Sequence, residues 1–161
     1  MINEKQLRTE IIRPALKALQ LWSESAEELM MLTCAIESQG GTYVAQVQGP
    51  ALGIFQMEPA THNSLWNVYL SRRTEFAYRI LAAIFLTTRP PVEYLKYNLL
   101  YSAMMARIYY FTVEEALPDA KNVEKLAEYW DKYYNRNPNK GTAPEAIAAY
   151  NKLMNIKKAK A

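Results

Sequence analysis

The stretch Ser25-Ala-Glu-Glu-Leu-Met-Met-Leu-Thr-Cys-Ala-Ile-Glu-Ser-Gln-Gly-Gly41 decides the fold. Ser25 and Glu28 have the spacing of a capping box, in which each side chain covers an unbonded amide at the start of a helix. The pair Gly40-Gly41 predicts the end of this helix, because glycine readily takes the left-handed conformation that stops one. The residues between these two signals include a row of apolar side chains, which predicts burial of this helix: Leu29, Met30, Leu32, Cys34 and Ile36.

Helical patterning continues on both sides of this stretch. Before it, leucine and isoleucine recur between Leu7 and Leu19, and Pro14 predicts a kink or break because proline lacks the amide that bonds one turn back. The segment 94–111 is apolar on nearly every side and is predicted to be a buried central helix. The remaining predicted helices cover 59–70, 76–86 and 122–134, and a last one that opens at the capping box Thr142-Ala-Pro-Glu145.

Residues 40–56 break the helical pattern. Tyr43-Val-Ala-Gln-Val-Gln48 alternates as a strand does, and Gly49-Pro50 and Gly53 are turn signals. A second turn is expected at 137–141. The sequence therefore predicts one mostly α domain over residues 1–161, with a loop or small β-hairpin at about 40–56.

Composition excludes several classes of protein. The 161 residues suit one domain, and a net charge of +3 without a clustered basic stripe argues against binding to nucleic acid. No apolar run is long enough to cross a membrane, and the N-terminus lacks the pattern of a signal peptide, so we expect synthesis in the cytoplasm. With one cysteine, Cys34, and one histidine, His62, which we expect on a helix surface, the chain predicts no disulfide, metal site or cofactor.

Glu37 is the first candidate for chemistry. It shares a helical face with Met30, Thr33 and Cys34, and it lies in the last turn, where backbone carbonyls carry partial negative charge. Desolvation and this charge both favour the neutral acid, so the position predicts a raised pKa, as a general acid requires. The alternative is a glutamate at a helix end that points into water.

Two motifs carry a resemblance to a known family. Ala35-Ile-Glu-Ser-Gln-Gly-Gly41, followed after a loop by Gly53-Ile-Phe-Gln-Met-Glu-Pro59, resembles the soluble lytic transglycosylases and the related goose-type lysozymes. In that family a helix ends in Glu-Ser, and Gly-Leu-Met-Gln follows the loop. The family motif Ala-Tyr-Asn has its counterpart in Tyr133-Tyr134-Asn135, with tyrosine in place of alanine. The resemblance covers about residues 26–136.

The resemblance implies a lysozyme-like domain that cleaves the glycan strands of peptidoglycan between N-acetylmuramic acid and N-acetylglucosamine. Glu37 would act as acid and then as base, giving a 1,6-anhydro product without water. It also implies a monomer that needs no cofactor and contacts neither nucleic acid nor membrane, and that acts on the cell wall as a phage lysis enzyme or a virion component. The residues that would contact or support the substrate are Ser38, Gln46, Gln56, Glu58, Tyr134 and Asn135.

Two alternatives remain open. Residues 38–57 contain no carboxylate, which favours transglycosylation, but Glu58 stands where the family has an apolar residue. If Glu58 faced the cleft, it could position water, and the enzyme would be a hydrolysing muramidase. If it faced solvent, it would only favour the start of the next helix. The second alternative is a non-catalytic virion or wall-binding protein with the same fold.

Overall fold

The computed structural model describes residues 1–135 and 141–155, and within these ranges it contains helices and no strand. This confirms the prediction of a mostly α fold. Residues 40–56 form a loop rather than a regular hairpin, with isolated antiparallel bridges between Ala45 and Leu52 and between Leu52 and Met57. The helical elements are α1 (Glu4–Gln6), η1 (Leu7–Ile12), α2 (Arg13–Ala18), α3 (Glu24–Ser38), α4 (Pro59–Ser64), η2 (Leu65–Leu70), α5 (Thr74–Ala83), α6 (Tyr94–Tyr97), α7 (Leu99–Phe111), α8 (Val123–Tyr133) and α9 (Ala143–Leu153).

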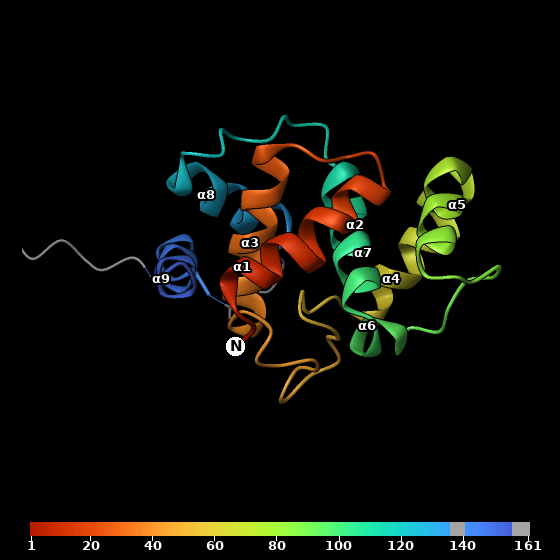
Figure 1. The fold of residues 1–161 in the computed structure, drawn as a ribbon, viewed down its shortest axis with the longest axis horizontal. Coiled ribbons are helices and arrows are strands. Elements are labelled where there is room, and N and C mark those ends of the chain that lie inside the picture. Colours follow the sequence, from red (N-terminus) through yellow and green to blue (C-terminus); the bar gives the residue numbers. More distant parts are fainter. Residues whose placement is uncertain (136–140, 156–161) are drawn as a thin grey trace, which may run out of the picture.

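Helices α3 and α7 lie at the centre of the molecule (Figure 1). Helix α7 packs against α2, η1, α3 and α6, and α3 packs against α8 and α9 as well. Every residue of 101–108 is buried, so the prediction of a buried central helix is confirmed for this part of 94–111. The predicted single helix is divided at Asn98, whose side chain accepts a hydrogen bond from the Tyr101 amide and caps α7. Asparagine is a favoured residue at such a position.

The first helical segment continues past Pro14 without a break, and it changes helix type before the proline. Residues Leu7–Ile12 form a π-helical segment, in which the amide of Arg13 bonds to the carbonyl of Arg8, five residues earlier. Pro14 then lies in the first two positions of α2, where a missing amide costs little. The predicted kink is thus a change of helical register.

Helix α3 begins two residues earlier than the capping box predicts. Ser23, not Ser25, accepts the hydrogen bond from the Ala26 amide. Glu28 does not close a box, because its carboxylate binds Arg8 and accepts a hydrogen bond from the Tyr150 hydroxyl. Side chains from distant segments therefore bind Glu28 in place of the backbone amide that a capping box would give it.

The carboxylate of Glu27 fastens α3 to the N-terminal segment. It accepts hydrogen bonds from Arg13 at 2.8 Å, from Trp22 at 2.7 Å and from Arg8 at 3.1 Å. Burial alone would raise the pKa of Glu27, but the bonds from Arg13, Trp22 and Arg8 outweigh it and hold the pKa at about 2. The buried charge is therefore fully paired, as a stable core requires.

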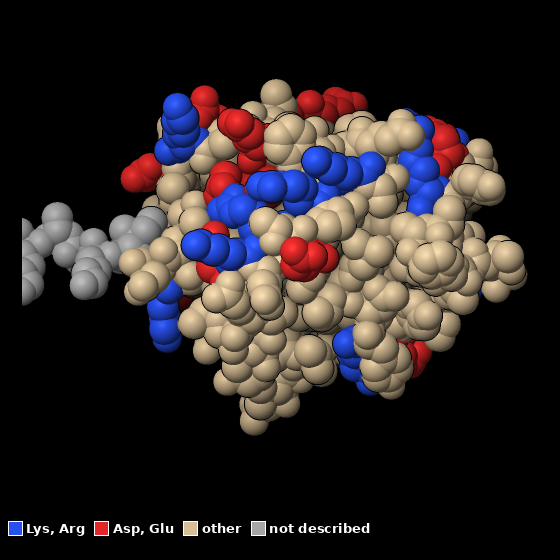
Figure 2. Space-filling view, in the orientation of Figure 1, with Lys and Arg blue, Asp and Glu red and all other residues tan. Residues whose placement is uncertain are grey.

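Charge is unevenly placed on the surface. Basic side chains, with acidic ones among them, gather over the N-terminal helical segment in Figure 2. Residues 38–57, which form the end of α3 and the loop after it, contain no charged side chain at all. Within 1–135 and 141–155, the helices are too short or too polar to span a bilayer. The turn predicted at 137–141 falls almost wholly outside the described residues.

His62 is buried, which corrects the prediction that it lies on a helix surface. Its Nε2 is 2.6 Å from the hydroxyl of Tyr101, and that hydroxyl also accepts a hydrogen bond from Trp66 Nε1 at 2.8 Å. Trp66 can only donate, so the Tyr101 proton remains available for His62 Nε2. This is the arrangement of a neutral imidazole that keeps its own proton on Nδ1, beside Asn63 Oδ1. The partner that makes burial possible comes from 39 residues away.

We expect this buried imidazole to make stability depend on pH. Burial lowers the pKa of His62 below its ordinary value of about 6.5, so the unfolded chain binds a proton that the folded chain does not. The contribution of neutral His62 to the free energy of unfolding is fully present above about pH 6.5. It is lost as the pH falls from there to the lower pKa of the folded state. Urea unfolding at a series of pH values should show this loss, and His62→Gln should remove it. An unchanged slope in His62→Gln would contradict the interpretation.

Candidate functional site

The end of α3 is fixed by backbone conformation and by Ser38. Gln39 takes the left-handed conformation at φ 53°, and the amides of Gln39 and Gly40 both bond to the carbonyl of Cys34. The buried hydroxyl of Ser38 donates to the carbonyl of Ile54 at 2.6 Å and accepts from the amide of Gly41 at 2.9 Å. The last turn of the helix, which carries Glu37, is therefore joined to the segment 53–56.

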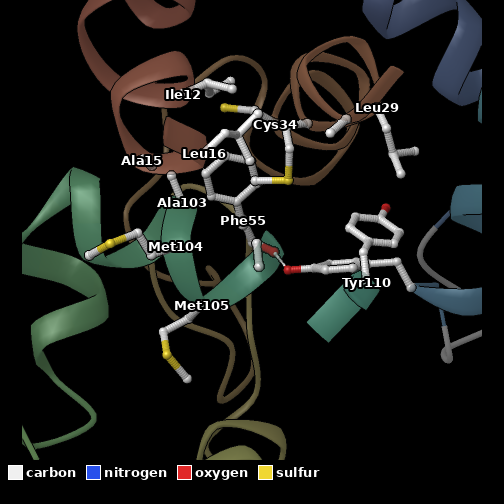
Figure 3. Close-up of a cluster of buried hydrophobic side chains, with 14 of the residues drawn as sticks. Ile12, Ala15, Leu16, Leu29, Cys34, Phe55, Ala103, Met104, Met105 and Tyr110 are labelled. Atoms are coloured by element: carbon white, nitrogen blue, oxygen red, sulfur yellow. Dashed lines mark hydrogen bonds between the residues drawn. The ribbon is translucent and has the colours of Figure 1, made fainter. Parts of the chain in front are cut away.

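The segment 53–56 is packed against the core and is bonded to Tyr134. Ile54 and Phe55 are fully buried, and Phe55 points into the core cluster near Cys34 and Ala103 in Figure 3. The buried hydroxyl of Tyr134 donates a hydrogen bond to the carbonyl of Phe55 at 2.7 Å. Ser38 and Tyr134 thus hold the two sides of this turn.

A pocket of about 330 Å³ lies between the last turn of α3 and the loop that follows it. It brings together three of the predicted site residues, Glu37, Gln46 and Gln56. Within the described residues its polar lining is one carboxylate, one tyrosine hydroxyl and amide side chains, and no cationic side chain takes part. The lining residues are Ile36, Glu37, Gln39, Tyr43, Ala45, Gln46, Val47, Gln48 and Gln56.

Glu37 is half-buried at the wall of this pocket. Its Oε1 accepts a hydrogen bond of 3.0 Å from the indole nitrogen of Trp130, which is completely buried in α8. A buried indole cannot move far, so it fixes the direction of the carboxyl group. Trp130 was not among the predicted site residues, although it lies one helical turn before Tyr134, a position that shares a helix face with it.

The two glutamines of the pocket are held differently. Gln56 is nearly buried in a left-handed conformation at φ 49°, and its Nε2 donates to the carbonyl of Gly53 at 3.0 Å. Gln46 closes its own turn, because its Oε1 accepts from the amide of Ala51 at 3.1 Å. Each side chain keeps amide atoms that could bond to a hydroxyl or an acetamido group of a ligand.

Four other predicted residues do not line the pocket. Ser38 and Tyr134 donate hydrogen bonds to the carbonyls of Ile54 and Phe55. Glu58 is exposed at the start of α4, in the position that the solvent-facing alternative predicts. Asn135 is half-buried, and its side-chain amide donates to Asp131 and to the carbonyl of Gly141, each at 2.9 Å. The structure thus places Asn135 as a support for the chain beyond α8.

The tyrosines near Glu37 are neutral. Burial raises the pKa of Tyr134 well above its ordinary value, and the negative charge of Glu37 adds to this effect. Burial also raises the pKa of Tyr110, whose hydroxyl lies 2.7 Å from the hydroxyl of Thr33. Neither phenol can therefore serve as a base near neutral pH. Glu37 supplies the one carboxyl group among the described lining residues, and a carboxyl group can donate or accept a proton.

The described part of the chain contains no group of three or more His, Cys, Asp or Glu side chains that could hold a metal ion. Comparisons with protein-family models, with curated proteins and with solved structures find no match for this chain.

Proposed function

We propose that the protein cleaves the glycan strands of peptidoglycan as a lytic transglycosylase, with a lysozyme-like fold. The observation that carries the proposal is the composition of the pocket: among the described lining residues, Glu37 is the single carboxylate, and amide side chains surround it. Neutral hydrogen-bonding groups suit a sugar, which offers hydroxyl and acetamido groups and little charge at the bond to be cleaved. The resemblance of the motifs at 35–41 and 53–59 supports the same substrate.

The reaction needs two proton transfers at one carboxyl group. Protonated Glu37 donates to the glycosidic oxygen, the bond to C1 of N-acetylmuramic acid breaks, and N-acetylglucosamine leaves with a new 4-hydroxyl group. The muramyl ring then carries oxocarbenium character. The carboxylate of Glu37 takes the proton of the muramyl 6-hydroxyl while O6 bonds to C1. The product is a 1,6-anhydro ring, and Glu37 is protonated again.

The geometry around Glu37 supports this sequence of steps. The bond from Trp130 fixes the direction of the Glu37 carboxyl group at the wall of the pocket. No second carboxylate lines the described pocket, whereas an inverting hydrolase needs one about 6.5–9.5 Å from the acid to activate water. The exposed position of Glu58 favours transglycosylation over the hydrolysing alternative.

Purified sacculi provide the test. We expect the protein to release soluble glycan fragments from them, measured as loss of turbidity and as muropeptides in the supernatant. A protein that sediments with sacculi and releases nothing would instead be a non-catalytic wall-binding protein. A protein that neither binds nor releases would contradict the proposed substrate. A role as a phage lysis enzyme or as a wall-degrading enzyme of the virion requires that release is observed.

A further inference from the structure

Arg107 is a buried cation without an anionic partner. Its side chain lies in the second half of α7, and only 7% of the residue is exposed. Its Nε donates to the carbonyl of Leu21 at 3.3 Å, and its guanidinium lies 5.4 Å from the ring centre of Phe111. Among the described residues, no carboxylate lies within ion-pair distance of it and nothing bonds its two terminal nitrogens. Buried charges in folded proteins are normally paired, so Arg107 is an exception to be explained.

Arg107 lies at the wall of a second pocket. This pocket has a volume of about 510 Å³ and shares no lining residue with the Glu37 pocket. A second guanidinium, that of Arg73, stands at this pocket and lies 6.0 Å from the same Phe111 ring. Arg73 is itself paired with Glu75 at 2.8 Å. Among the described residues, the pocket therefore contains one guanidinium without a carboxylate partner, that of Arg107, and one with a carboxylate partner, that of Arg73.

The rest of the lining indicates the size and nature of a ligand. The volume is far larger than a bare anion needs, and it lies within the usual range of small-molecule pockets. Seven of the twelve residues that line the wall are aromatic or apolar, and three of these carry a phenol hydroxyl: Tyr69, Tyr110, Phe111, Val113, Ala116, Leu117 and Tyr129. An occupant would thus place an anionic group at Arg107 and an apolar or aromatic body against this wall.

We propose that this pocket binds an organic monocarboxylate, with the carboxylate held by Arg107 and its remainder by the aromatic wall. A guanidinium binds a carboxylate through two parallel hydrogen bonds, and the two free nitrogens of Arg107 have that geometry. Burial lowers the pKa of Arg107, the direction expected when no anion offsets the loss of water. The site does not depend on the role of Glu37.

The negative charges at the rim favour a carboxylate over a phosphate. Glu114 and Glu115 are exposed and line the same pocket, and Glu115 lies 3.8 Å from Lys132. Their repulsion grows with the charge of the ligand, so a phosphate with nearly two negative charges is repelled more than a monocarboxylate. Phosphate binding is therefore the main competing outcome of the test.

Phenylacetate and its neutral counterpart phenylacetamide are the matched probes. We expect phenylacetate to cause saturable shifts in the amide resonances of residues 107–117 in ¹⁵N NMR spectra at constant ionic strength. Phenylacetamide and inorganic phosphate should bind at least about tenfold more weakly, because they lack the group that pairs with Arg107 or carry too much charge. This comparison uses the wild-type chain and does not rely on a variant that folds.

Two variants test whether Arg107 holds the carboxylate. Arg107→Met keeps an unbranched apolar side chain but removes the guanidinium, and it should weaken phenylacetate binding at least about tenfold through the loss of the charge-assisted hydrogen bonds. Arg72→Met removes an exposed cation next to Arg73 and should leave binding unchanged. Equal binding of the acid and the amide, tighter binding of phosphate, or undiminished binding by Arg107→Met would each overturn the proposal.

Discussion

Replacing Glu37 by glutamine should reduce glycan cleavage by about 100- to 10,000-fold, the range that general acid–base catalysis contributes. The amide keeps the shape of the side chain and can still accept the hydrogen bond from Trp130, so the fold should be preserved. It can neither donate a proton to the glycosidic oxygen nor take one from the 6-hydroxyl. Initial rates of muropeptide release, with circular dichroism as a check of folding, measure the effect.

Glu58→Gln is the matched control for this variant. Both are glutamates near the same loop, but Glu58 is exposed and does not line the pocket. We expect Glu58→Gln to release muropeptides at a rate close to that of the unchanged protein. Equal rates for Glu37→Gln and the unchanged protein would remove Glu37 from its proposed role. A loss in both variants would favour the hydrolysing alternative, in which Glu37 is the acid and Glu58 positions water.

Gly53→Ala should destabilise the fold by about 2 to 5 kcal/mol, from strain at a left-handed backbone and from overpacking. Gly53 has φ 80°, and a Cβ there would lie 2.5 Å from the carbonyl oxygen of Leu95 and would also meet Ser102 Oγ. The carbonyl belongs to the backbone of α6 and cannot turn aside. We expect the melting temperature to fall by about 10 °C, given about 2–4 °C per kcal/mol in a chain of this size.

Gly49→Ala is the control for Gly53→Ala. Its φ is not positive, and the three atoms nearest to the added methyl group belong to the end of the Gln46 side chain, which can move at the cost of its hydrogen bond from the Ala51 amide. We expect a change in melting temperature much smaller than that for Gly53→Ala. Similar melting temperatures for the two variants would show that the approach of Gly53 to α7 is not what holds the loop.

The local features of this fold were predictable from sequence. The helices after Pro59, at 122–134 and after Thr142 are found near their predicted positions, because proline, asparagine and threonine act on their immediate neighbours. The start of α3 was misplaced by two residues, since Ser23 and Ser25 are both able to cap and only the packing of Glu27 and Glu28 decides between them.

Interactions between distant segments could not be predicted in the same way. The burial of His62 depends on Tyr101, and the position of Glu37 depends on Trp130, which is 93 residues further along the chain. The unpaired state of Arg107 is a property of the whole packed interior, since it depends on which carboxylates the fold keeps away. Nothing in the local sequence distinguishes Arg107 from an arginine with a partner.

The mass of the products tests most directly whether one carboxyl group does all the proton transfer. Sacculi digested in ¹⁸O-labelled water should yield glycan fragments that end in 1,6-anhydro-N-acetylmuramic acid, lighter by one water than reducing ends and free of the label. Reducing ends that carry one ¹⁸O atom for each bond cleaved would show attack by water and would contradict the account.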